Sequence, residues 1–179
     1  MSDIIIIMPS AQVDWLRRKA KQIRKETGVP HHEALDIVAR EFGHLSDWHH
    51  VIESAKVTEP AERAHKTGLV IGMDVKEADD VNVSRLTHFV VDEQLYFFVL
   101  REYGKEGPVS WDDEDEEARQ IAHEFVFFRS KRLVPDTLDQ AVAIAEKDFF
   151  FAPRYLRLKG ERLIDPFEFG DEDEGGENG

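Results

Sequence analysis

The chain has no cysteine among its 179 residues. This absence excludes a disulfide framework, a thiolate nucleophile and a Cys-ligated zinc site, and a reducing compartment such as the cytoplasm is the expected location. No apolar run approaches the roughly 18 residues of a membrane-spanning helix, so no membrane association is expected. The short run Ile4 to Met8 follows Asp3 and stops at Pro9, which favours a buried strand over a secretion signal.

The sequence also lacks the common motifs of nucleotide and nucleophile chemistry. It contains no GxSxG, no P-loop and no GxGxxG, so a nucleophilic serine, a phosphate-cradling loop and a dinucleotide site have no starting point. His32-Glu33 and His123-Glu124 each begin an HExxH pattern, but neither has the second histidine. Zinc-protease chemistry is therefore unsupported, and no cofactor is expected.

The net charge of -14 is unevenly distributed along the chain. Residues 1–66 carry ten Lys or Arg against ten Asp or Glu, whereas residues 67–179 carry thirteen against twenty-seven. The acidity belongs to the second part. A surface this negative repels nucleic acid and attracts basic partners.

The first part of the chain predicts three short amphipathic helices. The first covers residues 11–27 with Ser10 as its N-cap, the second covers about residues 31–42, and a third, residues 46–55, is capped by Ser46. Side chains at helical spacing predict a small core between these helices. The residues expected to close that core are Leu16, Leu35, Phe42 and Trp48.

Residues 56–67 predict a boundary between two parts, because they have no clear periodicity and contain Pro60. Beyond them, residues 68–74 and 87–101 are rich in Val, Ile, Phe and Tyr, which favours strands. The polar pair Asp92-Glu93 interrupts the second run and predicts a hairpin.

Helices are predicted over about residues 111–132 and 137–150, followed by a hairpin over residues 154–164. The acidic, glycine-rich residues 170–179 predict a disordered tail. The expected fold class is α+β, with a mainly antiparallel sheet. The expected domains are an N-terminal strand and three-helix module at 1–58, an acidic α+β domain at 67–169 and the tail at 170–179.

Residues 16–52 read LRRKAKQIRKETGVPHHEALDIVAREFGHLSDWHHVI. This stretch resembles a helical module of uncharacterised plasmid-related proteins and of some glyoxalase-related proteins, in which a basic helix precedes an "AL..IAR..G..DW" pattern. The resemblance implies a mobile-element setting and carries no activity. The departures from the pattern are Pro30 and His32. The matching residues are Lys19, Ala20, Lys21, His31, Ala34, Leu35, Ala39, Gly43, Asp47 and Trp48.

Five of the eight histidines lie within residues 31–50, which raises the question of a metal site. The sharpest candidate is the set His44, Asp47 and His50, two histidines and a carboxylate. Helix caps and exposed positions also collect His and Asp, so a structural role is favoured over a metal.

The helices around Gly43 have the spacing of a helix-turn-helix, but the helix 46–55 offers no Arg, Lys, Asn or Gln to base edges. Base-specific DNA reading is therefore not expected. A positive stripe lies instead on the first helix, where it could hold phosphates or a partner, face solvent, or dock on the acidic domain. Its residues are Arg17, Arg18, Lys21, Arg24 and Lys25.

Six consecutive carboxylates occur where a helix is predicted to begin, and the helix dipole favours negative charge there. They serve either helix initiation and solubility or a negative surface for a nucleic-acid-binding partner. The run consists of Asp112, Asp113, Glu114, Asp115, Glu116 and Glu117.

These observations favour a non-enzymatic interaction protein, an accessory of a mobile element with an anti-defence or antitoxin role. Its acidic domain is expected to engage a basic or nucleic-acid-binding protein, with weak or no direct DNA binding. The alternative is a metal-dependent or His-using enzyme of an unrecognised class. An enzyme is expected to show a pocket with converging His, Arg and carboxylate groups, and an interaction protein an exposed apolar or charged patch.

Overall fold

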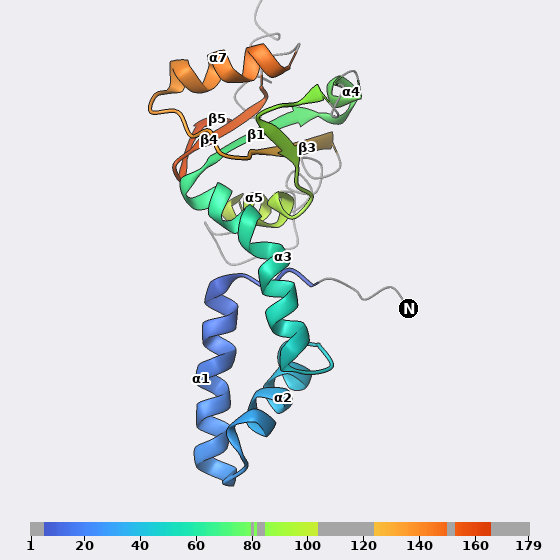
Figure 1. Ribbon diagram of the computed structural model, residues 1–179, viewed down its shortest axis with the longest axis vertical. Helices are drawn as coiled ribbons and strands as arrows, with labels where there is room; N and C mark the ends of the chain where they lie inside the picture. The colour runs from blue at the N-terminus through green and yellow to red at the C-terminus, as the bar shows by residue number, and fades with distance from the viewer. Residues whose placement is uncertain (1–5, 80, 82–84, 104–123, 150–152, 166–179) are drawn as a thin grey trace, which may run out of the picture. The chain divides into compact units, whose positions relative to one another are not determined.

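The structure is a computed structural model that describes residues 6–79, 81, 85–103, 124–149 and 153–165. It has the predicted α+β class, with helices first and an antiparallel sheet after them (Figure 1). The chain divides into two compact units, residues 1–62 and 63–179. Within the described ranges, no helix combines the length and the apolar character needed to cross a membrane.

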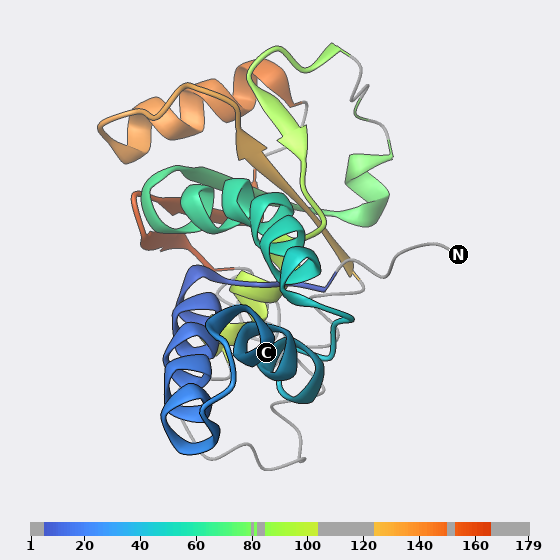
Figure 2. The same cartoon turned by 60° about the horizontal axis from the view of Figure 1, so that its bottom comes forward.

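The first unit contains α1 (Ser10–Thr27), α2 (His31–Glu41) and the larger part of α3 (Trp48–Thr67). Helices α1 and α2 lie side by side (Figure 2). Several core positions are alanines, and such small side chains let helices approach closely. The buried residues of this core are Met8, Val13, Leu16, Ala20, Ala34, Val38, Ala39 and Val51.

The predicted core residues of this unit differ in their burial. Leu16 is fully buried, as predicted, whereas Leu35 and Trp48 are half-buried. Phe42 is 37% exposed, so its prediction as a core residue is wrong. Its side chain lies at the edge of α2, where it contacts another aromatic ring rather than the core.

Residues 6–9 form no strand, so the strand prediction for the apolar N-terminal run is wrong where the structure describes it. Met8 is nevertheless 1% exposed, and its backbone N–H donates to Thr58 Oγ1 at 3.0 Å. The Met8 backbone N–H is satisfied although no neighbouring strand accepts its hydrogen bond, because the Thr58 hydroxyl does so.

Helix α1 begins at Ser10, not after it, and its N-cap is Pro9, which makes no side-chain capping bond. The carboxylate of Glu62 on α3 accepts hydrogen bonds from the Ser10 backbone N–H at 2.9 Å and from Ser10 Oγ at 2.7 Å. Glu62 is 7% exposed. A carboxylate distant in sequence thus replaces the predicted cap, in a position that the helix dipole favours.

Helix α3 runs unbroken through residues 56–67, where a boundary between two parts was predicted, and so extends past residue 55, the predicted end of the third helix. Its buried positions continue at helical spacing, but three of them are polar: Ser54, Thr58 and Glu62. The apolar periodicity in the sequence is therefore weak here, although the helix continues. Pro60 lies inside the helix and the unit boundary falls two residues later.

The second unit is built on a five-stranded sheet in the order β2-β3-β1-β4-β5, with every neighbouring pair antiparallel. Helices α5 (Leu95–Tyr103) and α7 (Leu138–Asp148) cover opposite faces of the sheet (Figures 1 and 2). A short helix, α4 (Val75–Ala78), follows the central strand. The strands are β1 (Leu69–Asp74), β2 (Phe89–Val91), β3 (Phe125–Ser130), β4 (Tyr155–Leu158) and β5 (Glu161–Ile164).

The central strand β1 is buried on both faces, as its continuous apolar sequence predicts. Leu69 and Ile71 pack in one core with Ala141 of α7. On the opposite face, a Cβ at Gly72 would lie 2.9 Å from a ring carbon of Phe127. Glycine is therefore required there, because the aromatic rings of the neighbouring strands fill the space.

Two secondary-structure predictions in this unit are wrong. The second half of the predicted hairpin 87–101 is the helix α5, in which Leu95, Phe98 and Val99 are buried at helical spacing. The predicted helix 111–132 is β3 over residues 125–130, and residues 111–123 lie outside the described part. In both places adjacent aromatic residues satisfy a strand and a helix pattern equally well.

The predictions of the last helix and of the final hairpin are confirmed. Helix α7 begins after Thr137, whose hydroxyl accepts from the Gln140 backbone N–H. Strands β4 and β5 form the predicted hairpin, which turns at Lys159 and Gly160 with φ of 52° and 86°. A glycine suits this left-handed turn because it has no Cβ to clash. The predicted tail, residues 170–179, lies outside the described residues.

Candidate interaction surface and polar clusters

The basic residues predicted on the first helix all lie on the exposed face of α1. Arg17, Arg18, Lys21, Arg24 and Lys25 are exposed. At about 100° per residue they occupy an arc of about 120°. Arg17 pairs with Asp14 at 3.2 Å, and the other four make no ion pair with any described residue. We call these five side chains the basic face.

An exposed aromatic pair borders the basic face. The rings of Trp15 and Phe42 meet edge to face with centroids 5.6 Å apart, and their residues are 43% and 37% exposed. Lys19 Nζ lies 5.6 Å from the centroid of the Phe42 ring, within the range of a cation–π contact. Exposed aromatic rings beside cations are a common composition of binding surfaces.

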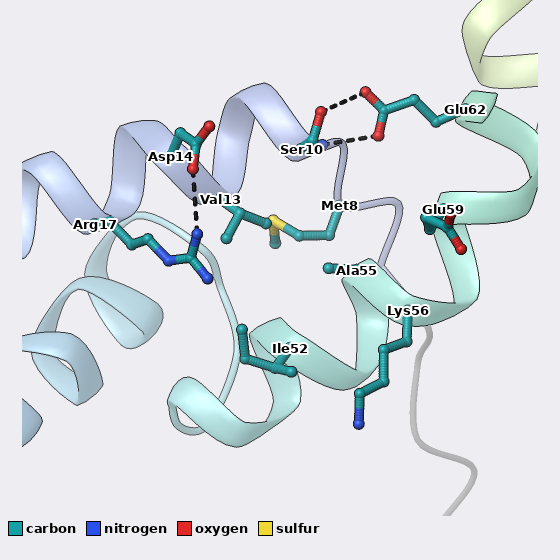
Figure 3. A pocket seen from close by; sticks show the side chains of 10 residues that line it. All are labelled: Met8, Ser10, Val13, Asp14, Arg17, Ile52, Ala55, Lys56, Glu59 and Glu62. Atoms are coloured by element: carbon teal, nitrogen blue, oxygen red, sulfur yellow. Dashed lines mark hydrogen bonds and ion pairs between the residues drawn. The ribbon is translucent and has the colours of Figure 1, made fainter. Parts of the chain in front are cut away.

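A pocket of about 330 Å³ opens between α1 and α3 within the first unit (Figure 3). Met8, Val13 and Ile52 supply apolar surface, while Arg17 and Lys56 contribute cations to its lining. Both cations are engaged, Arg17 with Asp14 and Lys56 with Glu53 at 2.7 Å. The pocket is apolar, and the cations in its lining already form ion pairs. One apolar group of a partner could therefore be buried in it without breaking an ion pair.

No protein-family model matches the chain, and neither a search of curated proteins nor one of solved structures finds a match. The function is therefore argued from the residues themselves.

The three residues of the candidate metal set, His44, Asp47 and His50, have different local surroundings. Asp47 Oδ1 accepts from the His50 backbone N–H at 3.1 Å and lies 2.9 Å from His50 Nδ1, and His50 Nδ1 is also 2.7 Å from Ser46 Oγ. His44 adopts φ 54° in the turn between α2 and α3. Among the described residues, no three His, Asp or Glu side chains are grouped as a metal site.

Asp47, not the predicted Ser46, caps α3. The backbone N–H of His50 holds the pKa of Asp47 below its ordinary value, and the His50 side chain adds to the effect. A carboxylate that accepts a hydrogen bond from a helix N-terminus is stabilised in its charged form. The geometry thus gives Asp47 and His50 a structural role at the start of α3.

A His, Glu, Tyr and Arg cluster lies on the α5 side of the sheet, and sequence reasoning missed it. Arg157 donates through Nε to the His65 carbonyl at 2.9 Å, through Nη2 to the Gly160 carbonyl at 2.6 Å, and through Nη1 to Glu102 Oε1. Glu102 Oε2 accepts from Tyr155 Oη at 3.4 Å. All three guanidinium nitrogens donate hydrogen bonds to acceptors within the protein. The cluster therefore links α3, α5 and the β4–β5 hairpin.

No local motif announces this cluster, because the hydrogen bonds that join its helices and strands link residues 53 to 92 positions apart. A second pair of the same kind joins Arg129 Nε to Asp92 Oδ2 at 2.7 Å. The only available signal is a charged residue in the middle of an apolar strand, as in Tyr155–Leu158, where burial of the charge requires a partner.

The predicted acidic surface, Asp112 to Glu117, lies outside the described residues. In the second unit, exposed carboxylates without a bonded partner among the described residues are found at five separate places. They are Asp79, Glu93, Asp139, Glu146 and Glu161.

Proposed function

We propose that this protein is a non-enzymatic interaction protein that engages a basic protein partner through its acidic second part. The basic face of α1 is a second contact, made to an anionic group of the assembly. The observation that carries the proposal is the division of charge, with cations exposed together on one helix and carboxylates in excess elsewhere.

The excess acidity is concentrated in two stretches of sequence. Residues 104–123 and 166–179 together hold thirteen acidic and two basic residues, so they account for most of the net charge of -14. Such a concentration produces a strong local potential that steers a cationic partner. Residues 112–117 form its densest run, which supports them as the partner surface.

The polar groups of the second unit support a binding role over a chemical one. The guanidinium groups of Arg157 and Arg129 are bonded to internal carboxylates and carbonyls, where they stabilise the fold. An anionic substrate would need the same N–H donors, which are already engaged. The first unit presents the opposite arrangement, in which cations and aromatic rings face solvent. Exposed charged and aromatic surface is what a protein interface requires.

A chain of this kind can compete with nucleic acid for a basic surface, because both present dense negative charge. We propose that it acts as an accessory protein in this way, with a nucleic-acid-binding protein as its partner. Anti-defence and antitoxin roles are two forms of the same competition.

The test compares the binding of a fluorescent decalysine peptide to three full-length proteins at about 150 mM salt. The first is the wild type, and the second has Asp112, Asp113, Glu114 and Asp115 changed to Asn and Gln. The third, matched control carries the same changes at Asp79, Glu93, Asp139 and Glu146, which alters net charge equally at other places. We expect the second protein to bind more weakly than the control.

If the second and third proteins lose the same affinity for the peptide, binding follows net charge alone. Residues 112–117 would then not be a specific partner surface. A separate measurement uses duplex DNA, for which we expect weak binding that disappears as salt rises. Tight, sequence-selective DNA binding at physiological salt would contradict the proposal.

A further inference from the structure

A second pocket lies in the second unit, where the end of β3 passes the residues that lead into β2. The Lys131 backbone N–H donates to the His88 carbonyl at 2.7 Å and joins the two segments. The pocket has a volume of about 490 Å³. It is lined by Thr87, His88, Lys131, Arg132 and Leu133.

The lining of this pocket is basic although its half of the chain is acidic. Two permanent cations, an imidazole and a hydroxyl line it, and none of the described lining residues is a carboxylate. Arg132 makes no hydrogen bond or ion pair with a described residue, and the only such contact of Lys131 Nζ is the Leu86 carbonyl at 3.4 Å. No carboxylate in the described ranges pairs with either cation, so an anion from solution can pair with them.

Hydrogen-bond partners of Nδ1 fix the orientation of the His88 ring. Its Nδ1 lies 3.2 Å from Oδ2 of Asp148, a side chain on α7 that is 9% exposed, and 3.0 Å from Thr87 Oγ1. A buried carboxylate that holds one ring nitrogen sets the direction of the other, as in many sites that bind ligands through histidine. Nε2 therefore remains for a ligand. Because Thr87 and Asp148 contact the same nitrogen, the three residues do not form a nucleophilic relay.

We propose that this pocket binds a phosphate monoester of a small molecule. Lys131 and Arg132 neutralise the phosphate, and the Thr87 hydroxyl supplies a directional hydrogen bond. His88 donates a second one through Nε2 when its imidazole is protonated. The volume exceeds that of a bare phosphate group and lies within the range of small-molecule sites. Leu133, which is 39% exposed, gives apolar surface to the rest of the ligand.

The experiment titrates isotopically labelled full-length protein with adenosine monophosphate and follows the backbone amide signals by NMR. Adenosine, which lacks the phosphate, is the matched ligand. We expect adenosine monophosphate to shift the signals of Lys131 and Leu133, adenosine to bind far more weakly, and inorganic phosphate to compete with the monophosphate. Equal binding of adenosine and its monophosphate would overturn the proposal, as would the absence of binding by either phosphate compound.

Two variants with the same loss of charge separate a site from general attraction. Arg132→Gln should weaken binding of the monophosphate by about tenfold or more, because it removes a charge-assisted contact. Lys76→Gln, at an exposed position on α4 that does not line the pocket, should leave the affinity unchanged. An equal loss in both variants would reduce the pocket to a nonspecific basic surface and contradict the assignment.

Discussion

The two units of this protein bury different kinds of side chain. The first closes its helices around Leu16, Val38 and three alanines, whereas the second buries whole aromatic rings such as Phe89, Phe128 and Tyr155. Small side chains bring helices together with little apolar area, and large ones give a sheet most of its stabilisation. The second unit is therefore expected to contain the more stable core.

The units also differ in where they place charge. In the second, Arg157 and Arg129 bond to carboxylates inside the fold. In the first, the basic face of α1 is turned to solvent, and Trp15 remains 43% exposed. The second unit thus uses its arginines inside the fold, whereas the first exposes its cations, and we propose α1 as a binding helix for that reason.

The largest expected effect tests the aromatic core of the second unit. Phe128 is fully buried and meets the Phe149 ring at 4.9 Å, so Phe128→Ala should destabilise the unit by about 3–5 kcal/mol. Phe97, 45% exposed, is the control, and Phe97→Ala should change stability by less than about 0.5 kcal/mol. Chemical denaturation measures both, and similar losses would show that burial does not separate the two rings.

The next effect concerns the internal charges. Arg157→Met removes the guanidinium that donates to Glu102 and to two carbonyls. It should cost about 3 kcal/mol in unfolding free energy, towards the lower end for a buried pair because Glu102 is 26% exposed and keeps its hydrogen bond from Tyr155. Arg154→Met removes an exposed pair with Glu77 at 3.5 Å and should cost less than about 1 kcal/mol. A stable Arg157→Met protein would free this cluster for a functional role.

The sequence predicted elements whose signals are local. Gly28, with φ 75°, ends α1 as expected, Gly160 lies in the final turn, and the helical spacing places all five cations on one exposed face. Such features depend on residues within a few positions of one another. The basic face was predictable for the same reason. It is the part of the predicted interaction surface that lies within the described residues.

Contacts between distant residues were not predictable. Glu62 caps α1 from 52 positions away, and Trp15 pairs with Phe42, which the helical pattern alone placed in the core. The helix α5 was mistaken for a strand because Tyr96, Phe97 and Phe98 have high strand propensity, and only packing decides between the two.

A smaller effect tests the distant cap in the first unit. Glu62→Ala removes two hydrogen bonds to Ser10 and should destabilise the first unit by about 2 kcal/mol. Glu53→Ala on the same helix removes only an exposed pair with Lys56 and should cost less than about 0.5 kcal/mol. Hydrogen exchange of the α1 amides measures both variants. Equal protection in the two would exclude Glu62 as the cap.

The smallest effect lies at the start of α3. The pKa of Asp47 is lowered first by the His50 backbone N–H, so it should stay below the ordinary value in His50→Ala, which keeps that N–H. Because the folded-state pKa is depressed, the contribution of this cap is present above the unfolded-state pKa and is lost as pH falls through the folded-state pKa. NMR titration of the Asp47 carboxyl decides. A full return to the ordinary pKa in His50→Ala would assign the effect to the side chain instead.

We propose that the acidic part of this chain attracts a basic partner through long-range electrostatic interaction. The most direct measurement is the association rate constant between the full-length protein and a decalysine peptide, followed by stopped flow from low to high salt. We expect a rate constant that falls steeply as salt rises and that is lowered at low salt by the changes at Asp112, Asp113, Glu114 and Asp115. A rate independent of salt, or unchanged by those substitutions, would contradict it.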